Sequence, residues 1–216
     1  MKLKDERRNV VVLFAKISGL SSETNTLSFQ DMFTRHNFIF RSLSDIIYKY
    51  EGYIDKYMGG EIMALFGAPI SHENNSLRAV LCSIEMLSRI RDFPGLKISI
   101  GLNFGLVFAG GVGSDRRMDY TVMGDTVNLA QRLESAAGPN QIYASETVFK
   151  ATRKEIEYKK LKPITVKGIN KPVTPYLPHE IKSRFIFHGT TEYPLEGREK
   201  EIALLFKVLK LSLIHI

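Results

Sequence analysis

Three cationic residues, Lys16, Lys56 and Arg132, lie at positions in the predicted elements where active-site groups often occur. Lys16 directly follows the apolar run Val10–Ala15, which predicts a strand buried on both faces. Proteins with mixed α and β structure often keep catalytic groups at the carboxyl end of such a strand. Lys56 precedes a glycine pair, and Arg132 lies four residues after Asn128 in a helical pattern, so these two share one helix face. Each is therefore a candidate active-site residue.

Each candidate also has an ordinary structural explanation. The stem of Lys16 could lie along the strand while its ammonium reaches water. Lys56 could be a charge that protects an edge strand. Asn128 and Arg132 could belong to a solvated helix face, because Val127, Ala130, Leu133 and Ala137 form the apolar face opposite them. Taken one at a time, these residues leave both explanations open.

The elements that must position these residues alternate between strand and helix. After the first strand, helical spacing of apolar residues predicts an amphipathic helix over about residues 28–50. Residues 52–69 predict a hairpin that turns at Gly59-Gly60, and a second helix follows. A long strand then leaves through a glycine-rich exit, before a short strand, a glycine turn and a helix closed by Gly138-Pro139. The order βαββαβ predicts an α+β, ferredoxin-like fold.

The remainder of the chain divides near residue 182. Shorter strands and a helix finish the first domain, and four of the eight prolines fall between residues 163 and 178, which suits edge strands and turns. Residues 183–216 change in character and begin a new amphipathic helix with no partner in this sequence. We therefore expect one domain over residues 1–182, followed by a linker and the start of a truncated module.

Composition narrows the setting. The single cysteine, Cys82, excludes an internal disulfide, and its helical surroundings favour a buried structural thiol. The charged amino terminus lacks the apolar stretch of a signal peptide, and no run reaches membrane-spanning length, so we expect a cytoplasmic protein with no membrane span.

Most of the net charge of +7 is concentrated in one segment. Eight lysines and arginines lie between Lys150 and Lys171, against two glutamates. A solvated sheet face explains this segment better than a surface that binds polyanions. No aromatic residues are interleaved with the cations, so we expect no nucleic-acid partner.

Four stretches together resemble the class III nucleotide cyclase catalytic domain. They are VVLFAKISGL, YIDKYMGGEIMALFGAP, GLNFGLVFAGGVGSDRRMDYTVMGDTVNLAQRLESA and TVKGINKPV. The resemblance covers about residues 8–178 in one register, and DYTVMGDTVNLAQRLE is its most specific part. It implies the cyclase version of the ferredoxin-like fold, with extra C-terminal strands and a helix. It also implies a reaction in which the ribose 3′-hydroxyl of a nucleoside triphosphate attacks the α-phosphate and releases pyrophosphate.

The resemblance assigns roles to four residues. Arg132 matches the arginine that stabilises the transition-state phosphate, and Asn128 matches the asparagine that orients the ribose. Lys56 and Thr121 match the two positions that read the base, in a combination similar to the adenine-selective one. Thr121 is similar to the version in soluble, bicarbonate-responsive adenylyl cyclases, whose second cyclase domain this chain most resembles. ATP is the nucleotide that this pattern implies.

The metal-binding half departs from the family. The resemblance implies two aspartates that hold Mg²⁺ or Mn²⁺, but Lys16 and Gly60 occupy their positions. A protonated lysine cannot ligate a cation. Glu61 follows Gly60 by one residue, so we expect its side chain to point to the opposite face and not to replace the lost carboxylate. This chain should bind no metal of its own, and a second cyclase domain, in cis or in trans, would have to supply the ion.

Two functions follow from this divided pattern. The chain could supply base-recognition and transition-state residues to a dimeric adenylate cyclase site and be inactive as a homodimer. Alternatively, it could be a catalytically dead cyclase domain that senses a nucleotide or regulates a neighbouring module. The segment LEGREKEIALL resembles the entry into the ATPase module that follows the second cyclase domain in soluble adenylyl cyclases, although no phosphate-binding P-loop motif occurs in this sequence.

Overall fold

The structure is a computed structural model that describes residues 6–20, 28–114, 117–166 and 171–182. The predicted module at residues 183–216 lies outside the described residues, and so the boundary near residue 182 stays a prediction. Within the described part of the chain, no helix combines the length and the apolar character needed to cross a membrane.

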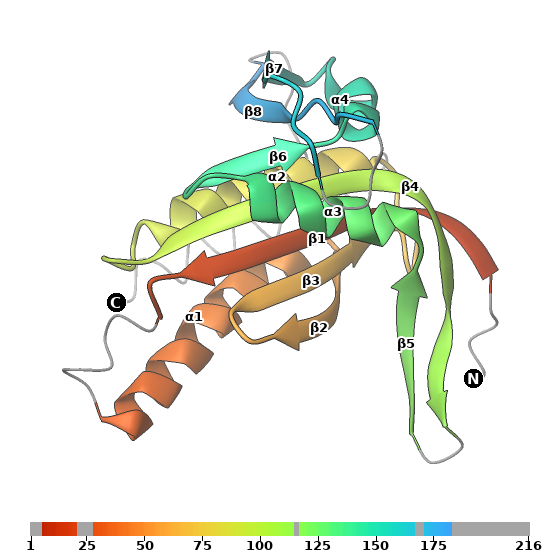
Figure 1. The fold of residues 1–216 in the computed structure, drawn as a ribbon. Helices are drawn as coiled ribbons and strands as arrows, with labels where there is room; N and C mark the ends of the chain where they lie inside the picture. The colour runs from red at the N-terminus through yellow and green to blue at the C-terminus, as the bar shows by residue number, and fades with distance from the viewer. Residues whose placement is uncertain (1–5, 21–27, 115–116, 167–170, 183–216) are drawn as a thin grey trace, which may run out of the picture. The chain divides into compact units, whose positions relative to one another are not determined.

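One mixed, largely antiparallel sheet forms the centre of the domain (Figure 1). Its first four strands lie in the order β2-β3-β1-β4, as in a ferredoxin-like fold. The predicted βαββαβ order is confirmed, with these bounds: β1 Glu6–Ser18, α1 Phe29–Lys49, β2 Tyr53–Met58, β3 Glu61–Phe66, α2 Asn75–Ile90 and β4 Lys97–Ser114. The turn between β2 and β3 is at Gly59-Gly60, and Gly59 takes the positive φ of 59° that favours glycine.

Helices cover both faces of this sheet. Residues alternate along β1, so that Val10, Val12 and Phe14 face one side and pack in a cluster with Ala130 of α3 (Asp125–Ala136). The helices α1 and α2 lie on the other side (Figure 1). From Val10 to Ile17, the strand β1 is therefore buried on both faces, apart from the exposed Lys16. This burial explains the unbroken apolar run that precedes Lys16 in the sequence.

The long strand β4 does not end at its glycines. It continues to Ser114 because β5 (Arg117–Met123) pairs with it along the register Phe108↔Met123 to Ser114↔Arg117. The predicted long strand is therefore confirmed, and its glycine-rich end at residues 110–113 is part of β4, since backbone pairing with β5 keeps these residues extended. Figure 1 shows the two strands as a hairpin that projects beyond the rest of the sheet.

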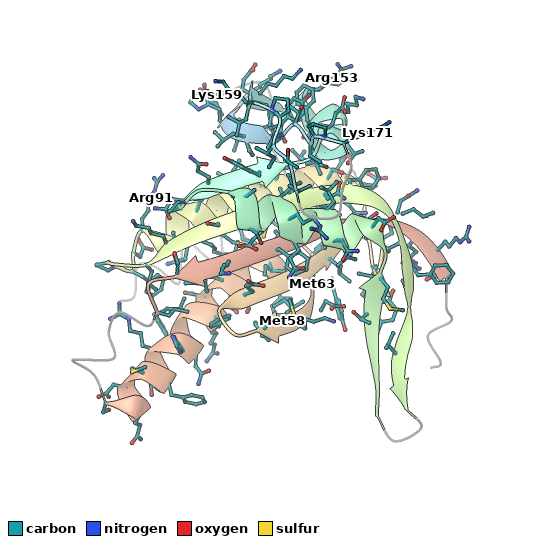
Figure 2. The ribbon with its side chains drawn as sticks, in the orientation of Figure 1. Met58, Met63, Arg91, Arg153, Lys159 and Lys171 are labelled. Carbon is teal, nitrogen blue, oxygen red and sulfur yellow. The ribbon has the colours of Figure 1, made fainter. Side chains whose placement is uncertain are left out.

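The C-terminal elements extend the sheet beyond β4. They are β6 Gln141–Ala144, α4 Glu146–Thr152, β7 Ile156–Lys160 and β8 Tyr176–Ile181, and the strands continue the sheet in the order β4-β6-β8-β7. Figure 2 shows the basic side chains Arg153, Lys159 and Lys171 on this part of the domain. All three are exposed. The predicted extra strands and helix are confirmed.

Candidate functional site

Lys16 is the one exposed residue within the buried part of β1, and it forms an ion pair across the sheet. Its register partner in β3 is Glu61, and Lys16 Nζ lies 3.2 Å from Glu61 Oε1. The hydrogen bond to Glu61 raises the pKa of Lys16, so its ammonium is held in the charged form. Lys16 is therefore more than a lysine whose head merely reaches water, since its charge has a fixed partner.

The position of Glu61 corrects one expectation from the sequence. Directly opposite residues in an antiparallel pair point to the same face, so Glu61 shares the face of Lys16. The expected opposite orientation was wrong because alternation was counted from Gly60. Gly60 belongs to the turn, and the strand begins only at Glu61. The carboxylate of Glu61 thus lies beside the first metal position, where the Lys16 ammonium neutralises it.

A second carboxylate lies under this ion pair. Glu134 of α3 is 1% exposed, and its Oε1 has no hydrogen-bond partner among the described residues, while its Oε2 accepts a hydrogen bond of 3.2 Å from Ser135. Burial raises the pKa of Glu134, and the neighbouring Glu61 raises it further, whereas Ser135 and Lys16 lower it. The Lys16 ammonium therefore interacts favourably with two carboxylates.

These residues do not fit a divalent cation at the two metal positions. Lys16 places a positive charge at the first, and Gly60 has no side chain at the second. The described residues contain no cluster of three or more histidine, cysteine, aspartate or glutamate side chains that could hold a metal ion. A lysine ammonium is a donor without a lone pair and repels Mg²⁺ or Mn²⁺. The chemistry of this face is that of an internal ion pair.

Lys56 and Thr121 are brought together by a residue that the sequence analysis did not single out. Thr121 Oγ1 of β5 donates a hydrogen bond of 2.9 Å to Asp55 Oδ2 of β2. Lys56 Nζ lies 3.2 Å from the same oxygen, and the Asp55 side chain has no exposed surface. A buried acceptor thus joins the two candidate base-reading side chains, although they lie 65 residues apart in the sequence, at positions 56 and 121.

Asn128 and Arg132 line a separate cavity along α3. This cavity has a volume of about 450 Å³, and Gln131, Ser135, Ala136, Thr165 and Val166 also line it. The predicted apolar face of α3 is confirmed at its centre, where Ala130 and Leu133 are buried. Val127 and Ala137 are only partly buried. Asn128 and Arg132 therefore point away from the core, as their spacing predicts.

Glycines allow α3 to lie close against β4. A Cβ on Gly101 would meet Ala130 O and Glu134 N at 2.2 Å, so only glycine permits this distance between helix and strand. Asn103 Nδ2 also donates a hydrogen bond of 3.0 Å to Thr126 O, which fixes the first turn of α3. Gly124 precedes the helix with a φ of 135°. This packing fixes the height of Asn128 and Arg132 above the sheet.

The sequence contained a signal for one of the two missed carboxylates. Glu134 follows the buried Ala130 by four residues, so helical spacing places it on the apolar face of α3, where an acidic residue is unusual. Asp55 had no such signal, because alternation assigns it the face opposite to that of Lys56. The structure assigns both residues to the candidate site.

Comparison with known proteins identifies the family. The sequence model of the adenylate and guanylate cyclase catalytic domain matches residues 3–180. The structure of the adenylyl cyclase CyaB from P. aeruginosa aligns with a TM-score of 0.80 and 30% identity, and covers 85% of this chain and 100% of that one. The guanylyl cyclase Cya2 aligns with a TM-score of 0.75 and 30% identity over 84% of this chain and 96% of its own.

Curated relatives agree but are longer. Adenylate cyclase 1 of Rhizobium meliloti is 26% identical over 151 residues, which are 66% of this chain and 22% of that protein. The adenylate cyclase of Anabaena cylindrica is 31% identical over 137 residues, which are 59% of this chain and 27% of that protein. The chain thus matches less than a third of the length of these relatives. It belongs to the family of class III adenylate and guanylate cyclase catalytic domains.

Proposed function

We propose that this domain supplies the base-recognition and transition-state half of an adenylate cyclase site, and that a second cyclase domain supplies the divalent cation. One observation carries the proposal. The two positions that should hold metal ligands carry an ion-paired lysine and a glycine, while the four positions for base, ribose and phosphate keep side chains suited to those tasks. A domain of this kind is inactive alone and useful in a mixed pair.

The substrate end is supported by the contacts around Asp55. Lys56 keeps an ammonium that is 43% exposed on the side chain and can donate to a ring nitrogen. Thr121 carries a hydroxyl held by a hydrogen bond of 2.9 Å. Adenine offers an acceptor nitrogen next to an amine donor, so a donor and an acceptor placed side by side favour ATP.

The reaction end is supported by the cavity along α3. Arg132 presents a planar guanidinium, and it lines the same cavity as the amide of Asn128. Charge that develops on the α-phosphate during attack by the ribose 3′-hydroxyl is stabilised by such a fixed cation. The amide can hold the ribose so that its hydroxyl faces the phosphorus. These two side chains therefore act as transition-state and positioning groups.

An exposed apolar stripe supports association with a second domain. Leu106, Phe108 and Val112 alternate along β4 and are 53%, 51% and 42% exposed. Met123 of β5 lies opposite Phe108 and is 55% exposed. Exposed apolar side chains gathered in this way mark interaction surfaces. A partner that covers the β4–β5 hairpin would bury them.

Complementation tests the proposal. The partner is a class III cyclase domain that keeps both metal aspartates but carries alanine at its own asparagine and arginine corresponding to Asn128 and Arg132, so that it cannot complete a site by itself. With ATP and Mn²⁺, we expect cyclic AMP only when both proteins are mixed. Arg132→Ala in this chain should lower the gain about 10²–10³-fold, and substitution of an exposed arginine, Arg153→Ala, should keep it. Absence of any gain, when gel filtration shows that the two proteins associate, would refute the proposal.

The Lys16–Glu61 pair also favours a second candidate function, a regulatory domain that binds nucleotide without catalysis. If a triphosphate displaced Glu61 from Lys16, the freed ammonium would neutralise part of its charge without a metal ion. Titration of the isolated chain with ATP in the presence of EDTA separates the two functions. Tight binding without metal, together with no activity in the mixed pair, supports the regulatory domain.

Four further expectations from the sequence remain part of this proposal. They are similarity to the second domain of soluble adenylyl cyclases, a partner in cis or in trans, Mg²⁺ or Mn²⁺ brought by that partner, and a cytoplasmic location. The expectation of no nucleic-acid partner also stays a prediction. One exposed cation of α4 is paired, with Lys150 Nζ 2.8 Å from Glu146 Oε1.

A further inference from the structure

A β-bulge places two neighbouring side chains in one site. The register of β2 with β3 shifts between Ile54, which pairs with Ala64, and Lys56, which pairs with Met63, so Asp55 is the extra residue. Adjacent residues of a regular strand point to opposite faces, but a bulge changes the direction of the side chains beside it. This irregularity lets the ammonium of Lys56 lie 3.2 Å from the carboxylate of Asp55.

The carboxylate of Asp55 is buried and only half satisfied. Its Oδ2 accepts from Thr121 Oγ1 at 2.9 Å and lies 3.2 Å from Lys56 Nζ. Its Oδ1 has no hydrogen-bond partner among the described residues, and the side chain has no exposed surface. An ionised carboxylate accepts hydrogen bonds and cannot donate them. The hydroxyl proton of Thr121 must therefore point inward, toward Asp55.

We propose that Asp55 sets the base specificity of this domain by fixing the direction of the Thr121 hydroxyl. With its proton committed to Asp55, Thr121 can offer only lone pairs to a bound base, while Lys56 offers only N–H donors. The pair then accepts the amine of adenine and donates to its adjacent ring nitrogen. Guanine places a carbonyl oxygen where adenine has the amine, and this oxygen would face the lone pairs of Thr121.

Asp55 is a positioning residue in this scheme, because it acts through Thr121 and does not touch the base. The inference rests on the proposed function, in which Lys56 and Thr121 read the base. It adds a third residue and a reason why a threonine, which can either donate or accept, behaves here as an acceptor. Without a fixed proton, the hydroxyl would rotate and serve either purine.

Two substitutions at Asp55 separate the role of its oxygen from that of its charge. Asp55→Ala removes the acceptor, so the Thr121 hydroxyl becomes free to rotate. Asp55→Asn keeps one acceptor oxygen, and the Lys56 ammonium beside it favours the orientation with that oxygen toward Lys56 and Thr121. We therefore expect Asp55→Ala to lose the preference for ATP and Asp55→Asn to keep it.

The experiment measures nucleotide binding by the mixed pair of the complementation assay. The probes are 3′-deoxy-ATP and 3′-deoxy-GTP, which lack the attacking hydroxyl. The readout is the dissociation constant of 3′-deoxy-GTP divided by that of 3′-deoxy-ATP. We expect Asp55→Ala to lower the ratio about 10-fold, the size of one hydrogen-bond mismatch, and Asp55→Asn to keep it within about 3-fold. A folded Asp55→Ala protein with an unchanged ratio would overturn the inference. Equal loss in both variants would also overturn it, because charge alone would then matter.

A second measurement needs no change at Asp55. A 3′-deoxy triphosphate of unsubstituted purine lacks the amine of adenine but keeps the ring nitrogen. We expect wild-type protein to bind it about 10-fold more weakly than 3′-deoxy-ATP, and Thr121→Val to abolish the difference. Equal binding of the two by wild-type protein would mean that Thr121 does not accept from the amine, and would refute the inference.

The outcomes also distinguish this inference from the proposed function. If wild-type protein prefers ATP and Thr121→Val weakens that preference, but Asp55→Ala does not, base recognition stands and the role of Asp55 fails. If the wild-type pair binds both nucleotides equally, and Lys56→Ala changes neither affinity, base recognition by these residues fails as well.

Discussion

Replacing Lys16 with methionine tests whether the ion pair with Glu61 holds this face together. The methionine keeps an apolar stem of similar length and removes the charge. At 3.2 Å, the Coulomb energy of the pair is about 5 kcal/mol at an effective dielectric constant of 20 and about 1.3 kcal/mol in water. The Lys16 side chain is 52% exposed, so solvent screening places the pair near the lower figure. We expect Lys16→Met to lower the free energy of unfolding by about 1 kcal/mol.

The pH dependence gives this prediction a sharper form. Burial raises the pKa of Glu134 in the folded protein above its value in the unfolded chain. The protonated side chain therefore stabilises the fold below the unfolded pKa, and this contribution is lost as the pH rises through the folded pKa. Lys16 lowers the pKa of Glu134, so its removal raises that pKa further. The destabilisation by Lys16→Met should therefore be larger at pH 8 than at pH 5. Lys16 itself is charged at both pH values, since its hydrogen bond to Glu61 raises its pKa above the ordinary value for lysine.

Thermal unfolding of the two proteins at pH 5 and pH 8 measures the effect. For a domain of this size, about 1 kcal/mol corresponds to about 2–4 °C in Tm. Glu61→Gln completes a double-mutant cycle, in which the coupling energy isolates the pair. A Lys16→Met protein with the wild-type Tm at pH 8, or with the same loss at both pH values, would refute the account of this ion pair.

Three further predictions follow from the same geometry. In the complementation assay, Asn128→Ala and Arg132→Ala should each lower the rate of cyclic AMP formation by about 10²–10³-fold, as expected for loss of a transition-state donor. Wild-type rates in both variants would contradict their roles. Gly101→Ala should lower the free energy of unfolding in urea by about 3 kcal/mol, because its Cβ would meet backbone atoms of α3 at 2.2 Å. The control is Gly138→Ala, which should cost less than about 1 kcal/mol because the nearest atoms to its Cβ belong to the movable side chain of Gln141. Phe108→Ser should weaken association with the partner domain about 10-fold in analytical ultracentrifugation. The control Phe33→Ser, which changes an exposed phenylalanine on α1, should leave the association unchanged. Equal effects of the two substitutions would exclude the β4–β5 stripe as the interface.

The sequence predicted the order and type of the central elements because each has a clear period. The apolar run before Lys16 and the helical spacing over residues 28–50 appear in the structure as β1 and α1. The glycine-rich end of the predicted long strand, at residues 110–113, also lies in β4, because pairing with a distant segment and not local propensity decides its conformation. Residues of β5 supply that pairing from the far side of the hairpin.

The candidate site was predictable only where its residues follow regular spacing. Asn128 and Arg132 obey helical periodicity and line one cavity as expected. Asp55 escaped prediction because a bulge breaks the alternation of β2, and a bulge has no signature in the residues around it. The orientation of Glu61 was mistaken because the end of a turn, and thus the start of the strand, cannot be fixed to a single residue from sequence.

Binding of Mn²⁺ tests the central claim most directly. Electron paramagnetic resonance of free Mn²⁺ is followed as the isolated chain is added without nucleotide, beside a Lys16→Asp/Gly60→Asp variant as positive control. A Cβ at Gly60 would meet Ile17 O at 3.0 Å, so a shift of a few tenths of an ångström admits the aspartate. We predict that the wild-type chain leaves the signal unchanged and that the variant reduces it. Loss of one equivalent of free Mn²⁺ with the wild-type chain, reversed by Glu61→Gln, would contradict the claim that this domain cannot hold its own metal.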